Sequence, residues 1–277
     1  MAKHSAKSAT ASNAASSEDQ RAWVIPALGG ATILSLVFYL WLAWLSQYHT
    51  LATDGVDRPI LLVIGVYAAA FVPYFLAWWT ATHARASKLL LFWLLGTSLL
   101  WRAILLPTAP FQEIDIYRYL WDGAVVSQGW DPYEYPPAKV VEAIDLAQAN
   151  VDYLETDRLL AMVEFATREA PEYETVLRTI HYGELPSPYP PVSQAVFAAA
   201  SLTSPFSTAT GHLAWLKGWL VGFDFATLLV VVWLLKITGK HAGHALAYGW
   251  CPLVMKEIAG SGHLDSIATF FAILAVA

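Results

Sequence analysis

Long apolar runs constrain this chain more than any other feature of its sequence. Residues 23–47, 59–82, 89–109 and 213–235 are apolar runs near the roughly 20 residues that a helix needs to cross a bilayer. The chain is 57% hydrophobic and only 14% charged, and its 13 Trp and 13 Tyr fit the aromatic belts of membrane proteins. We therefore predict an all-α, polytopic transmembrane helical bundle that is embedded in a lipid bilayer.

Several other classes of protein are excluded by motif and composition. No basic patch with interleaved aromatics indicates a nucleic-acid partner. Neither a GxxxxGK[ST] phosphate loop nor a GxSxG nucleophile motif occurs. The single cysteine, Cys251, excludes an intramolecular disulfide and a cysteine-based metal site.

Charge predicts the topology of the first half. The connector HARASK carries Arg85 and Lys88, which favours a cytoplasmic location. The Ala/Ser-rich residues 1–21 then form a disordered cytoplasmic tail, and residues 22–109 form three transmembrane helices. The loop 49–58 and the segment 110–188 lie on the extracytoplasmic side.

The segment 110–188 is long for a loop, and loops of that length are usually functional. Residues 140–155 and 157–169 have the pattern of amphipathic helices, and their acidic excess fits a solvated helical cap. We expect an extracytoplasmic catalytic loop with interfacial helices.

We expect further membrane helices in residues 189–277. If 190–205, 213–235 and 245–259 all cross the membrane, the basic connector 236–244 falls outside, against the positive-inside tendency. We favour the connector 236–244 inside and GHLDS outside, with one segment crossing incompletely. Residues 190–205 are few, and 245–259 contains Gly249 and Pro252. The chain stops inside an apolar run, so we expect a truncated sequence or a fragment.

Chemistry is concentrated in EIDIYRYLWDGAVVSQGWDPYEYPP, residues 113–137. A helix that starts near Glu113 puts Asp115, Arg118, Tyr119 and Asp122 on one face. A carboxylate beside an arginine at a membrane surface can act as a general base next to an anion-binding group. An amphipathic helix with solvated charges lying on the interface explains the spacing equally well.

Several residues in this region each have two interpretations, one functional and one structural. Glu113 is a second acid or a helix N-terminal residue, and Arg118 binds a phosphate or pairs with Asp115 or Asp122. Trp130 and Tyr133 stack on sugar faces or anchor the chain at the interface.

Charges elsewhere in apolar surroundings are costly and often functional. They are Arg102, Lys217, Asp224, Lys256 and Glu257. Lys217 and Asp224 can pair with each other or with another helix. His263 and Asp265 follow glycines that permit close approach of a ligand, but one His and one Asp are too few to assign a metal.

These elements together resemble the bacterial GT-C membrane glycosyltransferases, in the mannosyltransferase-like subgroup that uses polyprenyl-phosphate sugars. The resemblance rests on four motifs in order: Asp115 with YRY at 117–119 and WDG at 121–123; DPY at 131–133; YPP at 189–191 with Gln194; and Trp250, Pro252, Leu253 and Glu257 ending in GHLD at 262–265. Two departures are Ile114, where the family more often has an acid, and Cys251, where it often has Asn.

The resemblance implies a bacterial cytoplasmic-membrane enzyme with its active site on the extracytoplasmic face. Such an enzyme moves a hexose, with mannose favoured, from a polyprenyl-phosphate donor to a hydroxyl of a lipid or glycan acceptor and inverts the anomeric centre. Asp115 corresponds to the base. The donor phosphate and substrate are expected at Arg118, His263, Asp265, Arg102 and Glu257. Sugar or acceptor contacts are expected at Glu113, Tyr119, Asp122, Trp130, Tyr133, Tyr189 and Gln194.

No cofactor is assigned, although a divalent metal stays open. Two other classes also stay open: a transporter or flippase of lipid-linked sugars, which predicts inverted repeats that are not visible here, and a non-catalytic membrane fragment.

Overall fold

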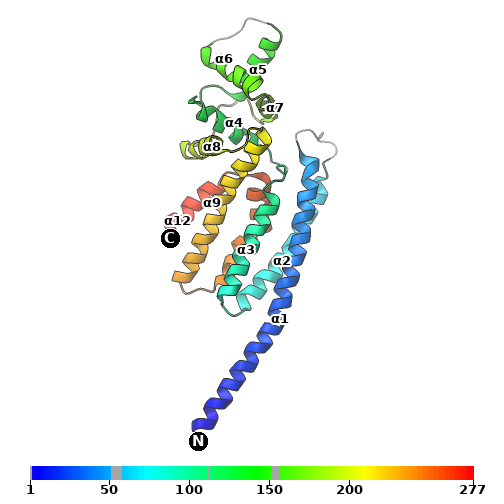
Figure 1. Cartoon of the computed structure of the whole chain (residues 1–277), viewed down its shortest axis with the longest axis vertical. Coiled ribbons are helices and arrows are strands. Elements are labelled where there is room, and N and C mark those ends of the chain that lie inside the picture. Colours follow the sequence, from blue (N-terminus) through cyan, green and yellow to red (C-terminus); the bar gives the residue numbers. More distant parts are fainter. Residues whose placement is uncertain (1, 51–57, 112, 151–155) are drawn as a thin grey trace.

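A computed structural model describes residues 2–50, 58–111, 113–150 and 156–277, with side chains from Trp23 onward. Every regular element in these ranges is helical, which confirms the predicted all-α class. A bundle of long helices forms one part of the molecule, and α4 to α8 gather beyond one end of it (Figure 1).

Four described helices are long and apolar enough to span a membrane: Trp23–His49, Ile60–His83, Lys88–Leu105 and Ala209–Ile237. They comprise α1 (Ala2–Leu45) with the short η1 (Ser46–His49), then α2 (Ile60–His83), α3 (Lys88–Leu105) and α9 (Ala209–Ile237). Many large apolar side chains on these helices are exposed, including Ile33, Leu61 and Leu89, as expected for surfaces that meet lipid. The chain is therefore an integral membrane protein.

The predicted tail differs from the structure, because α1 begins at Ala2 and continues the first span without a break. Extending an existing helix avoids the cost of nucleation, and the alanines of this tail favour extension. The loop predicted at 49–58 falls mainly on residues outside the described ranges.

The outer part contains α4 (Asp115–Ser127), α5 (Pro137–Gln148), α6 (Asp157–Glu164), the π-helical η3 (Phe165–Glu169), α7 (Glu172–Thr179) and α8 (Pro191–Thr203). The helix predicted over 140–155 ends at Gln148, because Asn150 adopts a positive φ of 53°. Residues 151–155 of that prediction lie outside the described residues. Thr156 caps α6 by accepting a hydrogen bond from Leu159 N at 3.2 Å.

The C-terminal part contains a segment that is broken into several short helices. After α9 the chain forms η4 (Ala242–Ala245), α10 (Leu246–Gly249), α11 (Pro252–Val254), the π-helical η5 (Met255–Ser261) and α12 (Asp265–Val276). The interruptions occur beside Gly249 and Pro252, as predicted. Neither α8 nor this broken stretch is among the described helices that qualify as spans.

The two ends of this broken stretch lie at opposite ends of the bundle. Gly243 packs against the end of α2, where an added Cβ would be 2.4 Å from Ala81 O. Ser261, at the other end, donates to Phe111 O at 2.9 Å, close to the start of α4. The basic connector 236–244 therefore lies at the same end as HARASK, and GHLDS lies at the α4 end. Which of these two ends faces the cytoplasm stays a prediction.

A buried ion pair ties α3, α9 and α10 together inside the bundle. Arg102 Nε donates to Asp224 Oδ2 at 2.5 Å, and Tyr248 donates to Asp224 Oδ1 at 2.5 Å. Arg102 Nη1 also donates to Ser98 O and to Gly249 O. Asp224 thus pairs with another helix and not with Lys217. Arg102 fixes the carbonyl exposed by the break after α10.

Candidate active site at the start of helix α4

Helix α4 begins at Asp115, directly after the connector that follows α3. Ile114 has a non-helical backbone, and Asp115 occupies the first turn, where the helix dipole favours a carboxylate. The Asp115 side chain is half-buried, while Glu113 is exposed and lies outside the helix. Asp115 therefore stands at the border between the packed interior and solvent, which suits a group that must meet a substrate.

The body of α4 is buried on all sides. Ten consecutive residues, from Ile116 to Val125, are buried. The alternative of an interfacial helix with solvated charges is therefore wrong. The reason is tertiary: α8, α7 and α9 all pack against α4 and cover the face that carries the charges.

Arg118 pairs with Asp122 and not with Asp115. Its Nε donates to Asp122 Oδ1 at 3.0 Å, and its Nη2 donates to Leu185 O at 3.0 Å. Because Arg118 is only 6% exposed, its main contacts are internal. The structure therefore gives Arg118 a part in holding the chain after α7 against α4, and does not bring its charge to the surface beside Asp115.

Asp122 is the centre of a buried polar network that joins α4 to α8. Ser187 Oγ donates to Asp122 Oδ2 at 2.5 Å, and Gln194 Nε2 donates to the same oxygen at 3.0 Å. Burial raises the pKa of Asp122, although Arg118 and the hydrogen bonds from Ser187 and Gln194 oppose the rise. Asp122 and Gln194, both predicted to contact sugar, are buried and bind each other instead.

An aromatic cluster lies beside Asp115. Tyr119 stacks on Phe197 with ring centroids 4.8 Å apart, and Tyr189 packs edge-on against Tyr119. Burial is the main cause that raises the pKa of Tyr119 well above its ordinary value. Tyr189 and the charges of Asp115 and Asp265 raise this pKa further. Burial and Asp115 also raise the pKa of Tyr189 to about 12. Asp115 and Asp265 therefore both lie within electrostatic reach of one tyrosine.

The GHLD loop packs directly on the start of α4. Gly262 has a φ of +78°, and an added Cβ there would lie 2.3 Å from Ile116 Cδ1. Lys217 of α9 is fully buried and links this loop to the segment that precedes α4. Its Nζ donates to Gly260 O at 3.0 Å and to Thr108 O at 2.8 Å. Segments more than a hundred residues apart are thus fixed at one place, next to Asp115.

His263 lies between two carboxylates in this loop. Its Nε2 is 3.5 Å from Glu257 Oε2, and its Nδ1 is 3.7 Å from Asp265 Oδ2. Lys256 Nζ donates to Glu257 Oε1 at 2.9 Å. The two carboxylates approach opposite ring nitrogens, so the three groups do not converge on one point. Within the described ranges, no group of three or more His, Cys, Asp or Glu side chains is placed to hold a metal.

The structure changes the interpretation of two basic residues, Arg102 and Arg58. Arg102 is completely buried in its pair with Asp224, so it is not placed to meet a donor phosphate. Arg58, which the sequence analysis did not select, lies near α4: burial raises the pKa of Tyr117 to about 12, and the charge of Arg58 opposes that rise. Arg58 Nε has no hydrogen-bond partner among the described residues. Its position just before a span was the available signal.

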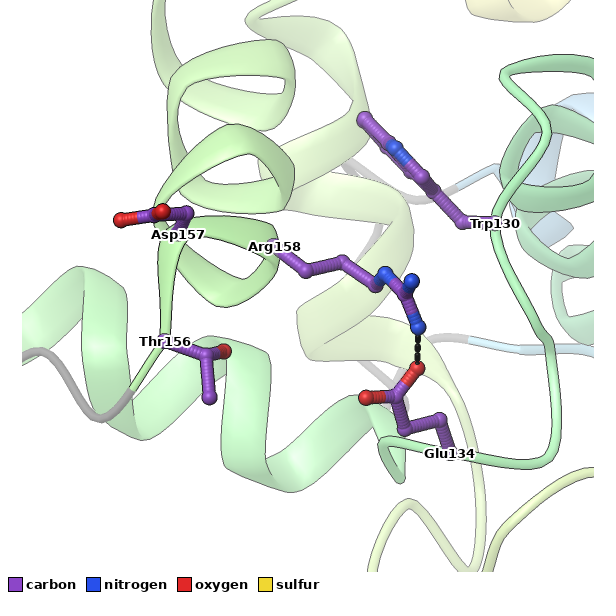
Figure 2. Close-up of a pocket in the computed structure, with 5 residues that line it drawn as sticks. All are labelled: Trp130, Glu134, Thr156, Asp157 and Arg158. Carbon is purple, nitrogen blue, oxygen red and sulfur yellow. Dashed lines mark hydrogen bonds and ion pairs between the residues drawn. The ribbon is translucent and has the colours of Figure 1, made fainter.

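The GWDPYEYPP stretch divides between two places. Tyr133 donates from its hydroxyl to Tyr189 O at 2.7 Å, which links the turn to the aromatic cluster. Trp130 instead lines a separate cavity with Glu134, Thr156, Asp157 and Arg158 (Figure 2). The predicted sugar contacts therefore do not form one site.

A known protein family is similar to part of this chain. Residues 27–154 match the MptA_B family, described as alpha-(1->6)-mannopyranosyltransferase, N-terminal domain. The resemblance to membrane mannosyltransferases is thereby confirmed. No match was found among curated proteins or among solved structures.

The matched residues include most of the first span, the second and third spans, α4 and α5, and so contain Asp115. The GHLD loop, Lys217 and the YPP segment lie outside the matched residues. Their place in the site rests on the contacts described above.

Proposed function

We propose that this protein transfers a mannosyl group from a polyprenyl-phosphate donor to a hydroxyl of a lipid or glycan acceptor, with inversion at the anomeric carbon. The observation that carries the proposal is Asp115, half-buried at the start of α4 within the matched mannosyltransferase domain. The family description suggests an α-1,6 linkage.

In the proposed reaction, Asp115 accepts the proton of the acceptor hydroxyl while the oxygen of that hydroxyl attacks the anomeric carbon of the donor sugar. The bond to the donor phosphate breaks as the new glycosidic bond forms, and the polyprenyl phosphate leaves. A base within hydrogen-bond reach of the hydroxyl contributes about 10²–10⁴-fold to such a step.

The location also suits a donor that is dissolved in lipid. Helix α4, which begins at Asp115, lies just beyond one end of the spans (Figure 1). A reactive phosphate at the membrane surface can therefore reach Asp115 while the lipid tail of the donor remains in the bilayer. We place the phosphate near Arg58 and His263, since Arg102 and Arg118 are committed to buried carboxylates. We place this end of the bundle on the extracytoplasmic face, because both basic connectors lie at the other end.

A panel of labelled polyprenyl-phosphate monosaccharides, offered to membranes that contain the full chain, tests the proposal. We expect label to pass to an α-mannoside acceptor from the mannose donor. Absence of transfer from every donor would reject the proposed activity and favour transport of lipid-linked sugars or a non-catalytic role. Transport receives no support from the buried charges, because Arg102, Asp224 and Lys217 are bound to internal partners.

A further inference from the structure

A surface cavity that is open to solvent lies at the end of α4 that is remote from Asp115. Its volume is about 610 Å³, and it is lined by Trp130, Glu134, Thr156, Asp157 and Arg158. This volume is within the usual range for ligand sites. The 13 residues of α4 span about 20 Å at the usual rise per residue, so the cavity is separate from the candidate active site.

The walls of this cavity are held in place by local contacts. The Trp130 backbone N–H donates to Val125 O at 3.1 Å, and its ring packs edge-on against Phe165 with centroids 6.0 Å apart. The Thr156 hydroxyl, besides capping α6, is 2.8 Å from the hydroxyl of Tyr135. A preformed site loses less entropy when it binds a ligand.

The groups that border the cavity suit a neutral sugar. Figure 2 shows the Trp130 ring and the Arg158–Glu134 ion pair around the same space, while the Asp157 side chain points away from the pair. The indole offers a flat apolar surface to a pyranose ring, and the ion pair offers a donor and acceptors to its hydroxyls.

The charges argue against an anionic ligand. Glu134 and Asp157 outnumber Arg158, so the lining has no excess positive charge with which to attract a phosphate. We propose that this cavity is an accessory subsite that binds a neutral pyranose unit of a long glycan acceptor, several units from the end that reacts at Asp115. The inference rests on the proposed glycosyl transfer and adds that the acceptor is an extended chain.

Acceptor length tests the subsite. The full chain in membranes would be assayed for transfer to α-1,6-linked mannobiose and mannohexaose. We expect wild type to have the lower KM for mannohexaose. Trp130→Ala and Arg158→Ala should raise that KM about tenfold, the effect of one lost contact of moderate strength, and leave the KM for mannobiose unchanged. Arg168→Ala is the matched control, because Arg168 forms an exposed ion pair with Glu164 elsewhere in the outer part.

Direct binding separates the subsite from the enzyme activity. Ligand-observed NMR with mannohexaose and the purified full chain should show binding to wild type and to Arg168→Ala, and loss of binding in Arg158→Ala. Since Arg158 is about half exposed, this variant should fold even if Trp130→Ala does not. Equal binding by wild type and Arg158→Ala, no binding by wild type, or equal KM effects on both acceptors would overturn the subsite. Binding lost in Arg158→Ala without any transfer by wild type would support the subsite and reject the proposed function.

Discussion

Gly262 and Ile116 approach so closely that an added Cβ at position 262 would lie 2.3 Å from Ile116 Cδ1. This contact joins the GHLD loop to the first turn of α4, one residue after Asp115. The geometry of the candidate active site therefore depends on a glycine at a position distant from Asp115 in sequence.

Gly262→Ala should reduce transfer about 10²-fold, the loss expected when a displacement of about 1 Å reaches reacting groups. Gly239→Ala is the matched control, because Gly239 also has a positive φ, of 67°, but nothing lies within 4 Å of its added Cβ. Both variants lose roughly 1–2 kcal/mol of stability to the left-handed backbone, so comparison of their rates and thermal unfolding isolates the contact. Equal activity in the two variants would contradict this account.

Gly123→Ala should separate α4 from α8, because its Cβ would lie 2.6 Å from Phe197 O, a backbone atom that cannot rotate away. We expect a loss of about 1–3 kcal/mol in the free energy of unfolding, the usual cost of overpacking. Gly65→Ala in α2 meets open space and should be neutral or stabilising by up to about 1 kcal/mol. Thermal unfolding in detergent measures both, and a stable Gly123→Ala would show that the packing adapts.

Asp224→Leu should destabilise the bundle by about 3–5 kcal/mol, because it leaves the fully buried Arg102 without its carboxylate. The double variant Arg102→Met, Asp224→Leu should recover part of this loss, since neither charge is then buried alone. Arg178→Ala, which breaks an exposed pair with Asp145, should cost at most about 1 kcal/mol. A double variant as unstable as the single one would argue that other contacts of Arg102 dominate.

Asp122 should make stability depend on pH in a defined direction. Burial raises its pKa above the ordinary value of 3.8, so as pH rises the unfolded chain releases this proton before the folded chain does. The stabilisation from Asp122 is thus complete below 3.8 and declines as pH rises through the folded pKa. The unfolding temperature of Asp122→Asn minus that of wild type should therefore become more positive as pH rises. A difference that is constant or moves the other way would contradict the raised pKa.

The spans could be predicted from sequence because each is a continuous apolar run with basic residues at one end. The break between residues 245 and 261 could also be predicted, because Gly249 and Pro252 both disfavour a continuous helix. The burial of α4 was not predictable, because its spacing fits an interfacial helix and only the packing of α7, α8 and α9 covers the second face.

The partners of the buried charges were equally beyond the sequence. Arg102 and Asp224 are separated by 122 positions, and Lys217 binds backbone carbonyls, which no side-chain pattern reveals. Asp122 was selected from helical spacing and Gln194 from the resemblance, but neither signal predicted that the two side chains bind each other.

The most direct test of the central claim is the rate of mannosyl transfer by Asp115→Asn, compared with wild type and Asp145→Asn at equal expression. Asp145 lies in an exposed ion pair of the outer part, so its substitution should leave the rate unchanged. We predict that Asp115→Asn lowers the rate by about 10²-fold or more, as for a general base. Transfer at the wild-type rate by Asp115→Asn would contradict the assignment of Asp115 as the base.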